Sequence, residues 1–345
     1  MDGPDEGVED GPRIFGGGDG GVSRKLYHAL STPEAIPWYL AAYSRGVRRA
    51  ARNGGIPEAA RYLPELFGLG TYWRYLRRQS EDGLVRRPVR GFEMWLPVED
   101  TGLARELVWR GIHEPAATAL YGRLLSRLAD HVGTVTVLDV GTNIGYFPLL
   151  ALEALPGDAR LLGVEPNPRA RELLERNLEL NGYRDRADVD ELALSDRDGT
   201  APFYLSEATN WSKLGDPPTR HTGRVIDVEV RTGDSYLRER GIAPEEINVV
   251  RMDVEGHELD LLEGMPAVLA AESPLLLFVE FHVELRDRGR LEEFVGLLQR
   301  NGLALERGVQ ELDYRPARTL TELEELSGFP FEEDVALQLF LRKGW

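Results

Sequence analysis

The 345-residue sequence contains no cysteine and only three lysines, at positions 25, 213 and 343. Without cysteine the chain has no disulfide, no thiolate metal site and no thiol nucleophile. It also lacks a long apolar run, because acidic residues and prolines interrupt the longest one, residues 261–281. The acidic, glycine-rich start of the chain has no apolar signal core. We therefore expect a soluble, non-exported, cytoplasmic protein.

Acidic residues dominate the charge, with 58 Asp and Glu against 41 Lys and Arg and a net charge of −17. Such a surface repels phosphate backbones, so we expect no nucleic-acid partner. An acidic surface that contains arginine but almost no lysine resembles the proteins of salt-loving archaea, which favours a halophilic archaeal origin.

Composition divides the chain into three parts. Residues 1–22 are acidic and glycine-rich and predict a disordered tail. Residues 23–89 predict a helical region, in which the stretch 35–90 carries eleven arginines among aromatic residues and only four acidic residues. This stretch fits peripheral contact with the cytoplasmic face of an anionic membrane, or pairing with the acidic remainder of the chain or with a second subunit. Residues 90–345 form the third part.

From residue 134 onward, expected strands and helices alternate, which predicts an α/β fold with a mostly parallel sheet and helices on both faces. Expected strands are 90–97, 134–140, 160–165, 187–194, 225–231, 247–252, 275–281, 303–306 and 335–341, with a hairpin at 201–205. Expected helices are 115–130, 143–155, 168–181, 257–270 and 291–301.

The first motif, Asp139-x-Gly141-x-Asn143-x-Gly145, follows a short β-branched strand. A turn of small residues lets the backbone approach a ligand and directs the next helix N-terminus toward it. The dinucleotide fingerprint requires glycine at its first, third and sixth positions, which here are Gly141, Asn143 and Tyr146. The pattern therefore disfavours NAD. An ordinary strand–turn–helix corner is the alternative.

The second motif is Glu165, 20 residues after Gly145 at the end of the next strand. A carboxylate in this place can accept hydrogen bonds from both hydroxyls of a ribose, as in nucleoside-binding α/β folds. Pro168 fits the start of a helix, so a helix-capping acid is the alternative. Together with the glycine turn, Glu165 predicts a nucleoside cofactor.

The third motif places Asp253, Glu255 and His257 directly after the buried strand 247–252, with Glu280 and His282 at the end of strand 275–281. Open α/β sheets bind ligands at the carboxyl ends of their strands, and crowded ionisable groups suit acid–base catalysis. Capping of the following helix is the alternative for the residues after strand 247–252. These side chains are also types that bind Mg²⁺, but no ligand spacing requires it, and we expect no metal.

Together the glycine turn, the Glu165-Pro166-Asn167-Pro168 segment and the D-x-E-G-x-E segment at 253–258 resemble the FkbM family of S-adenosylmethionine-dependent methyltransferases. Segments 111–115 and 279–282 also resemble it, so the likeness spans about 90–340. It implies a Rossmann-like class I methyltransferase fold. The predicted helical region 23–89 is an N-terminal extension outside the likeness. S-adenosylmethionine is the implied cofactor. The implied reaction is O-methylation of a hydroxyl or carboxyl on a sugar, a glycan or another small acceptor, lipid-linked if 35–90 contacts a membrane. An RNA methyltransferase and a non-catalytic glycan-assembly or membrane adaptor are the alternatives.

The expected general base is His282, because the ordinary pKa of histidine lies near neutrality, with Asp253 and His257 as alternatives. Residues 191–193 are expected to contact the adenine through their backbone. The expected cofactor-binding residues are Glu114, Asp139, Gly141, Asn143, Gly145, Glu165, Asn167, Glu191, Leu192, Ala193, Asp253 and Glu255.

Overall fold

The computed structural model describes residues 76–100, 102–206, 212–215, 221–312, 315–332 and 335–345. The predicted disordered tail 1–22 and the predicted helical region up to residue 75 lie outside the described residues. The elements from β1 onward belong to a compact unit, Glu81–Trp345. This unit begins before the expected boundary at residue 90, because β1 (Leu84–Val89) is a strand that pairs antiparallel with β2 (Phe92–Pro97).

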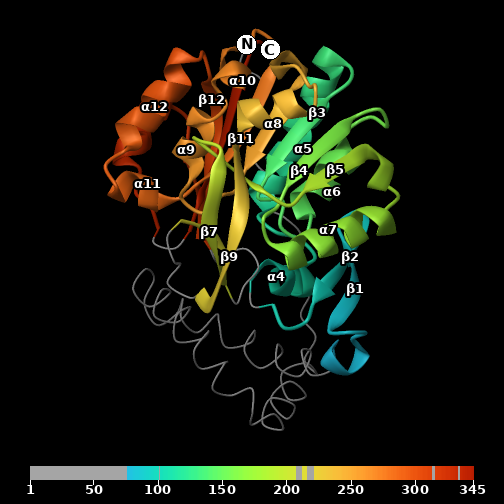
Figure 1. Ribbon diagram of the computed structural model, residues 1–345. Coiled ribbons are helices and arrows are strands. Elements are labelled where there is room, and N and C mark those ends of the chain that lie inside the picture. Colours follow the sequence, from blue (N-terminus) through green and yellow to red (C-terminus); the bar gives the residue numbers. More distant parts are fainter. Residues whose placement is uncertain (1–75, 101, 207–211, 216–220, 313–314, 333–334) are drawn as a thin grey trace, which may run out of the picture. The chain divides into compact units, whose positions relative to one another are not determined.

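An eight-stranded sheet in the order β13-β12-β14-β11-β10-β3-β4-β5 forms the centre of the unit (Figure 1). The five neighbouring strands β11, β10, β3, β4 and β5 are parallel to one another. Strand β14 pairs with β11 in the antiparallel direction. The chain runs outward from β3 to β5 and then returns to β10 on the other side of β3. This reversal makes β3/β10 the switch point at which doubly wound sheets bind ligands. The strands are β3 (Thr136–Val140), β4 (Arg160–Val164), β5 (Ala187–Asp190), β10 (Val249–Met252), β11 (Leu275–Phe281), β12 (Ala304–Leu312), β13 (Arg315–Leu320) and β14 (Leu337–Lys343).

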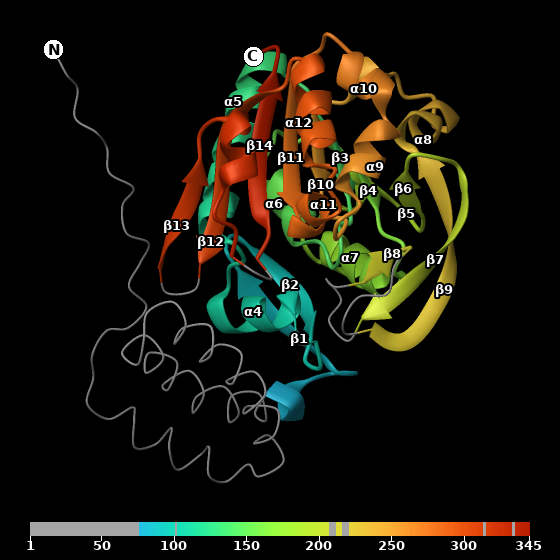
Figure 2. The ribbon, with the colours of Figure 1, turned by 90° about the vertical axis from the view of Figure 1, so that its left-hand side faces the viewer.

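Helices cover both faces of this sheet, which confirms the α/β fold (Figure 2). One face carries α5 (Pro115–Val132), α6 (Tyr146–Ala154) and α7 (Pro168–Leu180). The other face carries α8 (Gly233–Glu239), α9 (Glu258–Glu263), α10 (Pro266–Ala270) and α12 (Leu291–Arg300). Two further helices are α4 (Leu103–Arg110), which packs on β2, and α11 (Val283–Asp287), which follows β11. Short 3₁₀ turns are η2 (Arg184–Arg186), η4 (Pro244–Glu246) and η5 (Leu323–Gly328).

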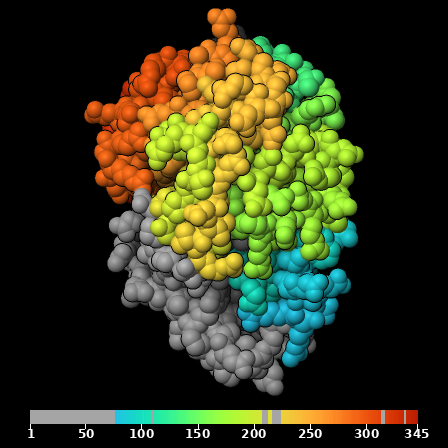
Figure 3. Space-filling view, viewed as in Figure 1, coloured from blue at the N-terminus to red at the C-terminus, as the bar shows by residue number. Residues whose placement is uncertain are grey.

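A second, four-stranded sheet has the order β6-β9-β7-β8. It lies at the surface between the α12 side and the α7 side of the unit (Figure 3). The predicted strand 187–194 is wrong, because it is two strands in different sheets. Neighbouring β4 ends at Val164, opposite Asp190, so the chain leaves the main sheet there. The strands are β6 (Ala193–Ser195), β7 (Gly199–Ser206), β8 (Lys213–Leu214) and β9 (His221–Thr232).

Two predicted helices have different bounds for identifiable backbone reasons. The helix expected from residue 143 begins at Tyr146, because Gly141, Asn143 and Gly145 have positive φ angles of 78°, 49° and 99°. The helix expected over 257–270 is two helices, α9 and α10. Gly264 packs so closely on Ser195 that a Cβ there would lie 1.8 Å from the Ser195 carbonyl oxygen. Pro266, which lacks an N–H, then starts α10.

Aromatic rings fill the space between the sheet and the α5–α6 layer. Phe278 of β11 stacks on Phe340 of β14 with ring centroids 4.4 Å apart. The centroids of Tyr121 of α5 and Phe147 of α6 lie 5.1 and 5.3 Å from that of Phe278. Phe278 is fully buried, so its ring joins two strands to both helices. Among the described residues, no helix is long and apolar enough to span a bilayer.

Phe278→Ala is expected to lower the free energy of unfolding by about 3–5 kcal/mol, because it removes a ring that touches every layer of this core. Chemical denaturation of the full chain measures the loss. Val225→Ala, at a strand position that is 46% exposed, is the control and should change stability by no more than about 0.5 kcal/mol. Equal losses in the two variants would contradict this description of the core.

Candidate functional site

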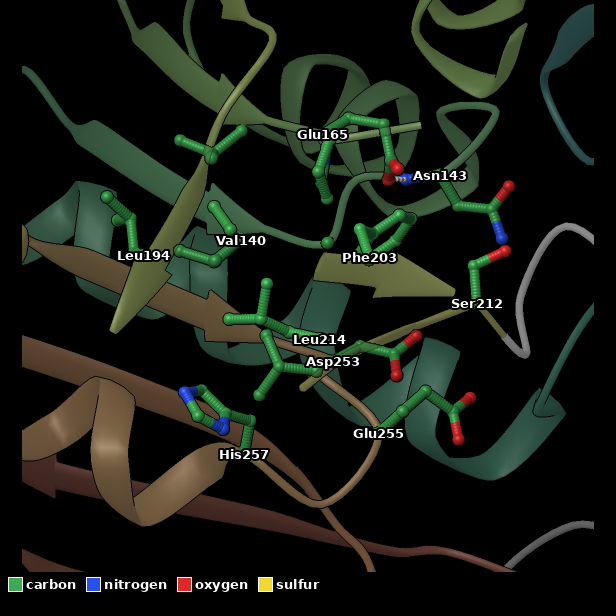
Figure 4. Close-up of a pocket in the computed structure, with 15 residues that line it drawn as sticks. Val140, Asn143, Glu165, Leu194, Phe203, Ser212, Leu214, Asp253, Glu255 and His257 are labelled. Carbon is green, nitrogen blue, oxygen red and sulfur yellow. Dashed lines mark hydrogen bonds between the residues drawn. The ribbon is translucent and has the colours of Figure 1, made fainter. Parts of the chain in front are cut away.

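A pocket opens at the carboxyl ends of β3, β4 and β10, where the second sheet meets the main one (Figure 4). The pocket is open to solvent, and the empty space of about 570 Å³ at this place includes part of that solvent. Its walls combine apolar side chains with several carboxylates. The lining residues are Val140, Gly141, Asn143, Val164, Glu165, Pro166, Ala193, Leu194, Phe203, Ser212, Leu214, Asp253, Val254, Glu255 and His257.

The turn after β3 is held against the neighbouring strands. Gly141 N donates to the Val164 carbonyl at 2.9 Å. A Cβ on Gly141 would lie 2.0 Å from the Asp253 carbonyl oxygen. Glycine is therefore required here by the close approach of β3 and β10, in addition to its positive φ. This contact brings the β3 turn and the acidic loop after β10 to the same pocket.

Glu165 joins the β3 turn to the start of α7. Its Oε2 accepts from Asn143 N and its Oε1 from Asn167 N, both at 2.8 Å. The residue is only 6% exposed. Burial raises the pKa of Glu165 to about 7, although both backbone N–H groups favour the charged form. Each carboxylate oxygen accepts one N–H and keeps capacity for another donor from the pocket.

Arg251 of β10 lies beneath the pocket and joins carboxylates from three adjacent strands. Its Nη1 lies 3.3 Å from Oδ1 of Asp139 in β3. Its Nη2 lies 3.0 Å from Oδ2 of Asp253, which follows β10, and 3.4 Å from Oε2 of Glu280 in β11. Arg251 also donates to the Gly141 carbonyl at 2.9 Å. The Arg251 side chain is 3% exposed and that of Asp139 is fully buried. One guanidinium therefore orients the ends of three strands.

The sheet register explains this arrangement. Arg251 pairs laterally with Asp139 on one side and with Phe278 on the other, so all three side chains share one face. The guanidinium carbon lies 4.5 Å from the centroid of the Phe147 ring, a cation–π contact from α6. Burial raises the pKa of Asp139 to about 6, while Arg251 favours its charged form.

Arg251→Met is expected to destabilise the fold by about 3–5 kcal/mol, because it leaves buried carboxylates without their counter-charge. Adding Asp139→Asn should recover part of this loss by removing one of those charges. Denaturation of the single and double variants measures both effects. A double variant that is less stable than Arg251→Met alone would contradict the pairing.

His282 lies between two carboxylates. Its Nδ1 is 2.6 Å from Glu258 Oε1, and its Nε2 is 3.5 Å from Glu255 Oε2. Burial alone would lower the pKa of His282, but Glu255 and Glu258 raise it well above its usual value. Burial also raises the pKa of Glu255 to about 8. Both ring nitrogens are thus engaged, which does not favour the expected role of His282 as general base.

His257 lines the pocket, but its ring is also engaged at both nitrogens. Nε2 lies 2.7 Å from Ser195 Oγ, and Nδ1 lies 3.1 Å from Asp260 Oδ2. Burial lowers the pKa of His257. The ring therefore ties the start of α9 to β6 rather than presenting a free nitrogen to the pocket.

Two glutamates, Glu106 and Glu114, lie beside His113, the second residue before α5. His113 Nδ1 lies 2.6 Å from Glu106 Oε2, and its Nε2 lies 3.9 Å from Glu114 Oε1. Burial would lower the pKa of His113, but Glu114 and Glu106 raise it to about 10. Burial raises the pKa of Glu114 to about 7. Gln338 donates to Glu114 Oε1, while Glu114 Oε2 has no hydrogen-bond partner among the described residues.

The sequence of this site matches a known domain. A profile of the methyltransferase FkbM domain matches residues 139–316, more than half of the chain. This chain belongs to the FkbM family of S-adenosylmethionine-dependent methyltransferases. The match begins at Asp139 in β3 and includes both Glu165 and the acidic loop after β10, so it contains all the residues that line the pocket.

Individual relatives match shorter stretches than the family profile. Methyltransferase sdnD of Sordaria araneosa is 30% identical over 159 residues, which cover 37% of this chain and 60% of that protein. The human protein named Transmembrane O-methyltransferase is 40% identical over 62 residues, 18% of this chain and 21% of that protein. The solved O-methyltransferase of Bacillus cereus in complex with SAH has a TM-score of 0.39 and 12% identity, covering 65% of this chain and 80% of that one.

The pocket of this FkbM-family chain fits S-adenosylmethionine chemically. Glu165 offers acceptor oxygens for a ribose, and Phe203 and Leu214 offer apolar surface for a base. Asp253 and Glu255 line the same pocket and complement a cationic ligand. S-adenosylmethionine carries all three features: a ribose, an aromatic base and a positively charged sulfur.

Seven of the residues predicted to form the site line this pocket. They are Gly141, Asn143, Glu165, Ala193, Asp253, Glu255 and His257. The other predicted residues do not line it, because they have structural contacts elsewhere. Those residues are Glu114, Asp139, Gly145, Asn167, Glu191, Leu192 and His282.

The contacts of four of these show what they do instead. Gly145 packs on α7, where a Cβ would lie 2.6 Å from Leu174. Asn167 caps α7 by accepting from Arg169 N at 3.1 Å. Glu191 is exposed and lies 3.1 Å from Arg171. Leu192 packs against the hydrophobic core.

Three parts of the site were not predicted. Phe203 and Leu214 reach the pocket from the second sheet, which only the strand pairing reveals. Glu258 ends the D-x-E-G-x-E segment, but no site role was assigned to it, although it is fully buried against His282. Arg251 had a usable signal, since it is the one charged residue in the apolar strand 247–252.

Proposed function

We propose that this chain transfers the methyl group of S-adenosylmethionine to a hydroxyl oxygen of a small acceptor such as a sugar. The observation that carries the proposal is that Glu165 from β4 and Asp253 from β10 line one pocket (Figure 4). One carboxylate suits the hydroxyls of a ribose, and the other suits an acceptor hydroxyl.

At the cofactor end, Glu165 would accept hydrogen bonds from the ribose, and Leu194, Phe203 and Leu214 would pack on the adenine. The bound cofactor supplies a methyl group that its positively charged sulfur has already activated. The residues of the chain then need only to hold the acceptor in line and to accept a proton.

At the acceptor end, Asp253 is the best placed of the three residues expected to accept that proton. Both ring nitrogens of His257 and of His282 already contact other side chains. Asp253 lines the pocket, and Arg251 fixes its Oδ2 at 3.0 Å. Asp253 would therefore take the proton that the acceptor hydroxyl loses when its oxygen is methylated.

The printed name Transmembrane O-methyltransferase of a relative supports oxygen as the acceptor atom, over the short stretch that it matches. A sugar, glycan or lipid-linked acceptor is part of this proposal because the pocket offers several carboxylates to a polyhydroxylated molecule. The proposed contact of residues 35–90 with a membrane surface falls mostly on residues outside the described ones.

Affinity for S-adenosylmethionine is expected to depend on the charge of Glu165. Because the pKa of Glu165 is about 7, protonation below this value removes acceptor capacity, and binding should be about tenfold weaker at pH 6 than at pH 8. Calorimetric titration at both pH values measures the ratio. In Glu165→Gln, binding should be weaker at both pH values and the ratio should disappear. If Glu165→Gln binds S-adenosylmethionine as tightly as the wild type, Glu165 does not accept hydrogen bonds from the ribose as proposed.

Asp253→Asn is expected to lower kcat by about 10²–10⁴-fold, as for loss of a general base, which is a larger effect than the loss of affinity for S-adenosylmethionine that follows from removing its charge. Turnover is measured as SAH formed from a panel of monosaccharides and other small alcohols. Asp287→Asn, an exposed aspartate on α11, is the matched control and should keep full turnover. A wild type that binds the cofactor but methylates no hydroxyl in the panel would contradict the proposed acceptor class.

A further inference from the structure

Three side chains from two loops meet beside the acceptor end of the pocket, which two of them line. Asp253 and Glu255 follow β10, and His282 follows β11. A carboxylate oxygen of each acid and a ring nitrogen of His282 all lie within 4.8 Å of one another. Glu255 has a positive φ of 51°, so the loop turns its side chain back toward this group. We call these three residues the acidic triad.

A fourth residue, Glu258, fixes the histidine of the acidic triad from behind. Its side chain is fully buried, and its Oε1 lies 2.6 Å from His282 Nδ1. Its other oxygen, Oε2, has no hydrogen-bond partner among the described residues. Histidines that bind metals usually donate their second nitrogen to such a carboxylate, which holds the ring in place. The Nε2 atom of His282 is thus the one that faces Glu255.

The ion pairs around the acidic triad are unevenly distributed. Arg251 contacts Asp253 and also Glu280, which lies beside the group. In the part of the chain that the structure describes, no lysine or arginine forms an ion pair with Glu255, whose nearest counter-charge is His282 at 3.5 Å. Glu258 shares the same imidazole.

Two further cations lie at the neighbouring Gly256: Arg288 donates to its carbonyl at 3.4 Å, and a Cβ on Gly256 would lie 3.5 Å from Lys213 Nζ. In the described part of the chain neither forms an ion pair with Glu255, whose carboxylate therefore keeps acceptor capacity for a cation bound beside His282.

We propose that one oxygen of Asp253, one oxygen of Glu255 and a ring nitrogen of His282 bind a divalent cation of the magnesium or manganese type. The cation contacts and polarises the acceptor hydroxyl, and the other oxygen of Asp253 accepts the proton that this hydroxyl loses. Two carboxylates and one imidazole suit Mn²⁺ or Mg²⁺ and leave coordination positions for water and for a hydroxyl. The role toward the acceptor rests on the proposed methyl transfer. Binding of the cation does not rest on it.

Titration of the full chain with Mn²⁺, followed by the electron paramagnetic resonance signal of free Mn²⁺, tests the site without cofactor or acceptor. We expect one saturable site per chain. Glu255→Gln and His282→Gln each remove a ligand and should abolish saturable binding. Glu258→Gln should weaken binding by about 10–100-fold, as expected for a residue that orients a ligand. Glu292→Gln, an exposed glutamate on α12, is the control and should bind Mn²⁺ like the wild type.

Far-ultraviolet circular dichroism shows whether each variant is folded, and Asp253→Asn replaces any variant that is not. Binding of Mn²⁺ that is equal in wild type and folded ligand variants would overturn the proposal, as would no saturable binding by the wild type. Saturable binding of Zn²⁺ without Mn²⁺ would also overturn it. A separate titration with S-adenosylmethionine in the presence of chelator tests the proposed function. If S-adenosylmethionine does not bind in this titration but Mn²⁺ binds in the first one, the proposed function is contradicted and the cation site is supported.

Discussion

The guanidinium of Arg251 is the interaction on which the site depends. It is buried between the sheet and α6, and it contacts carboxylates at the ends of three neighbouring strands. Three like charges brought together in a protein interior would repel one another strongly, so the sheet can place them side by side only because one cation lies among them. The strand register provides this position by aligning Arg251 with Asp139.

The pocket has two chemically different ends because its carboxylates are supported in different ways. Glu165 is held by two backbone N–H groups, which are dipoles that carry no net charge. Asp253 is held by Arg251, whereas Glu255 forms its ion pair within the described residues with the imidazole of His282. The first end is suited to neutral hydroxyl donors. The second end retains negative charge, which suits a positively charged sulfur and, in our proposal, a metal ion.

Several features of the site could be predicted from local sequence because each follows directly from chain order. Glu165, Asp253 and Glu255 come directly after strands, and parallel strands bring their carboxyl ends to one edge. Asp139 was predicted as the first residue of the glycine-turn motif, but its side chain faces Arg251 rather than the pocket. For a residue inside a strand, the face of the sheet to which its side chain points depends on the strand register, which the motif alone does not give.

The sequence by itself determined the α/β class and the acids that follow its strands, because periodicity and the order of elements along the chain are properties of consecutive residues. The tertiary structure alone decided which partners those acids have. Phe203 reaches the pocket because the second sheet folds beside the first, and His282 meets Glu258 across two separate loops. Such contacts join residues far apart in the chain, and their chemistry depends on burial and charge that arise only once the layers pack.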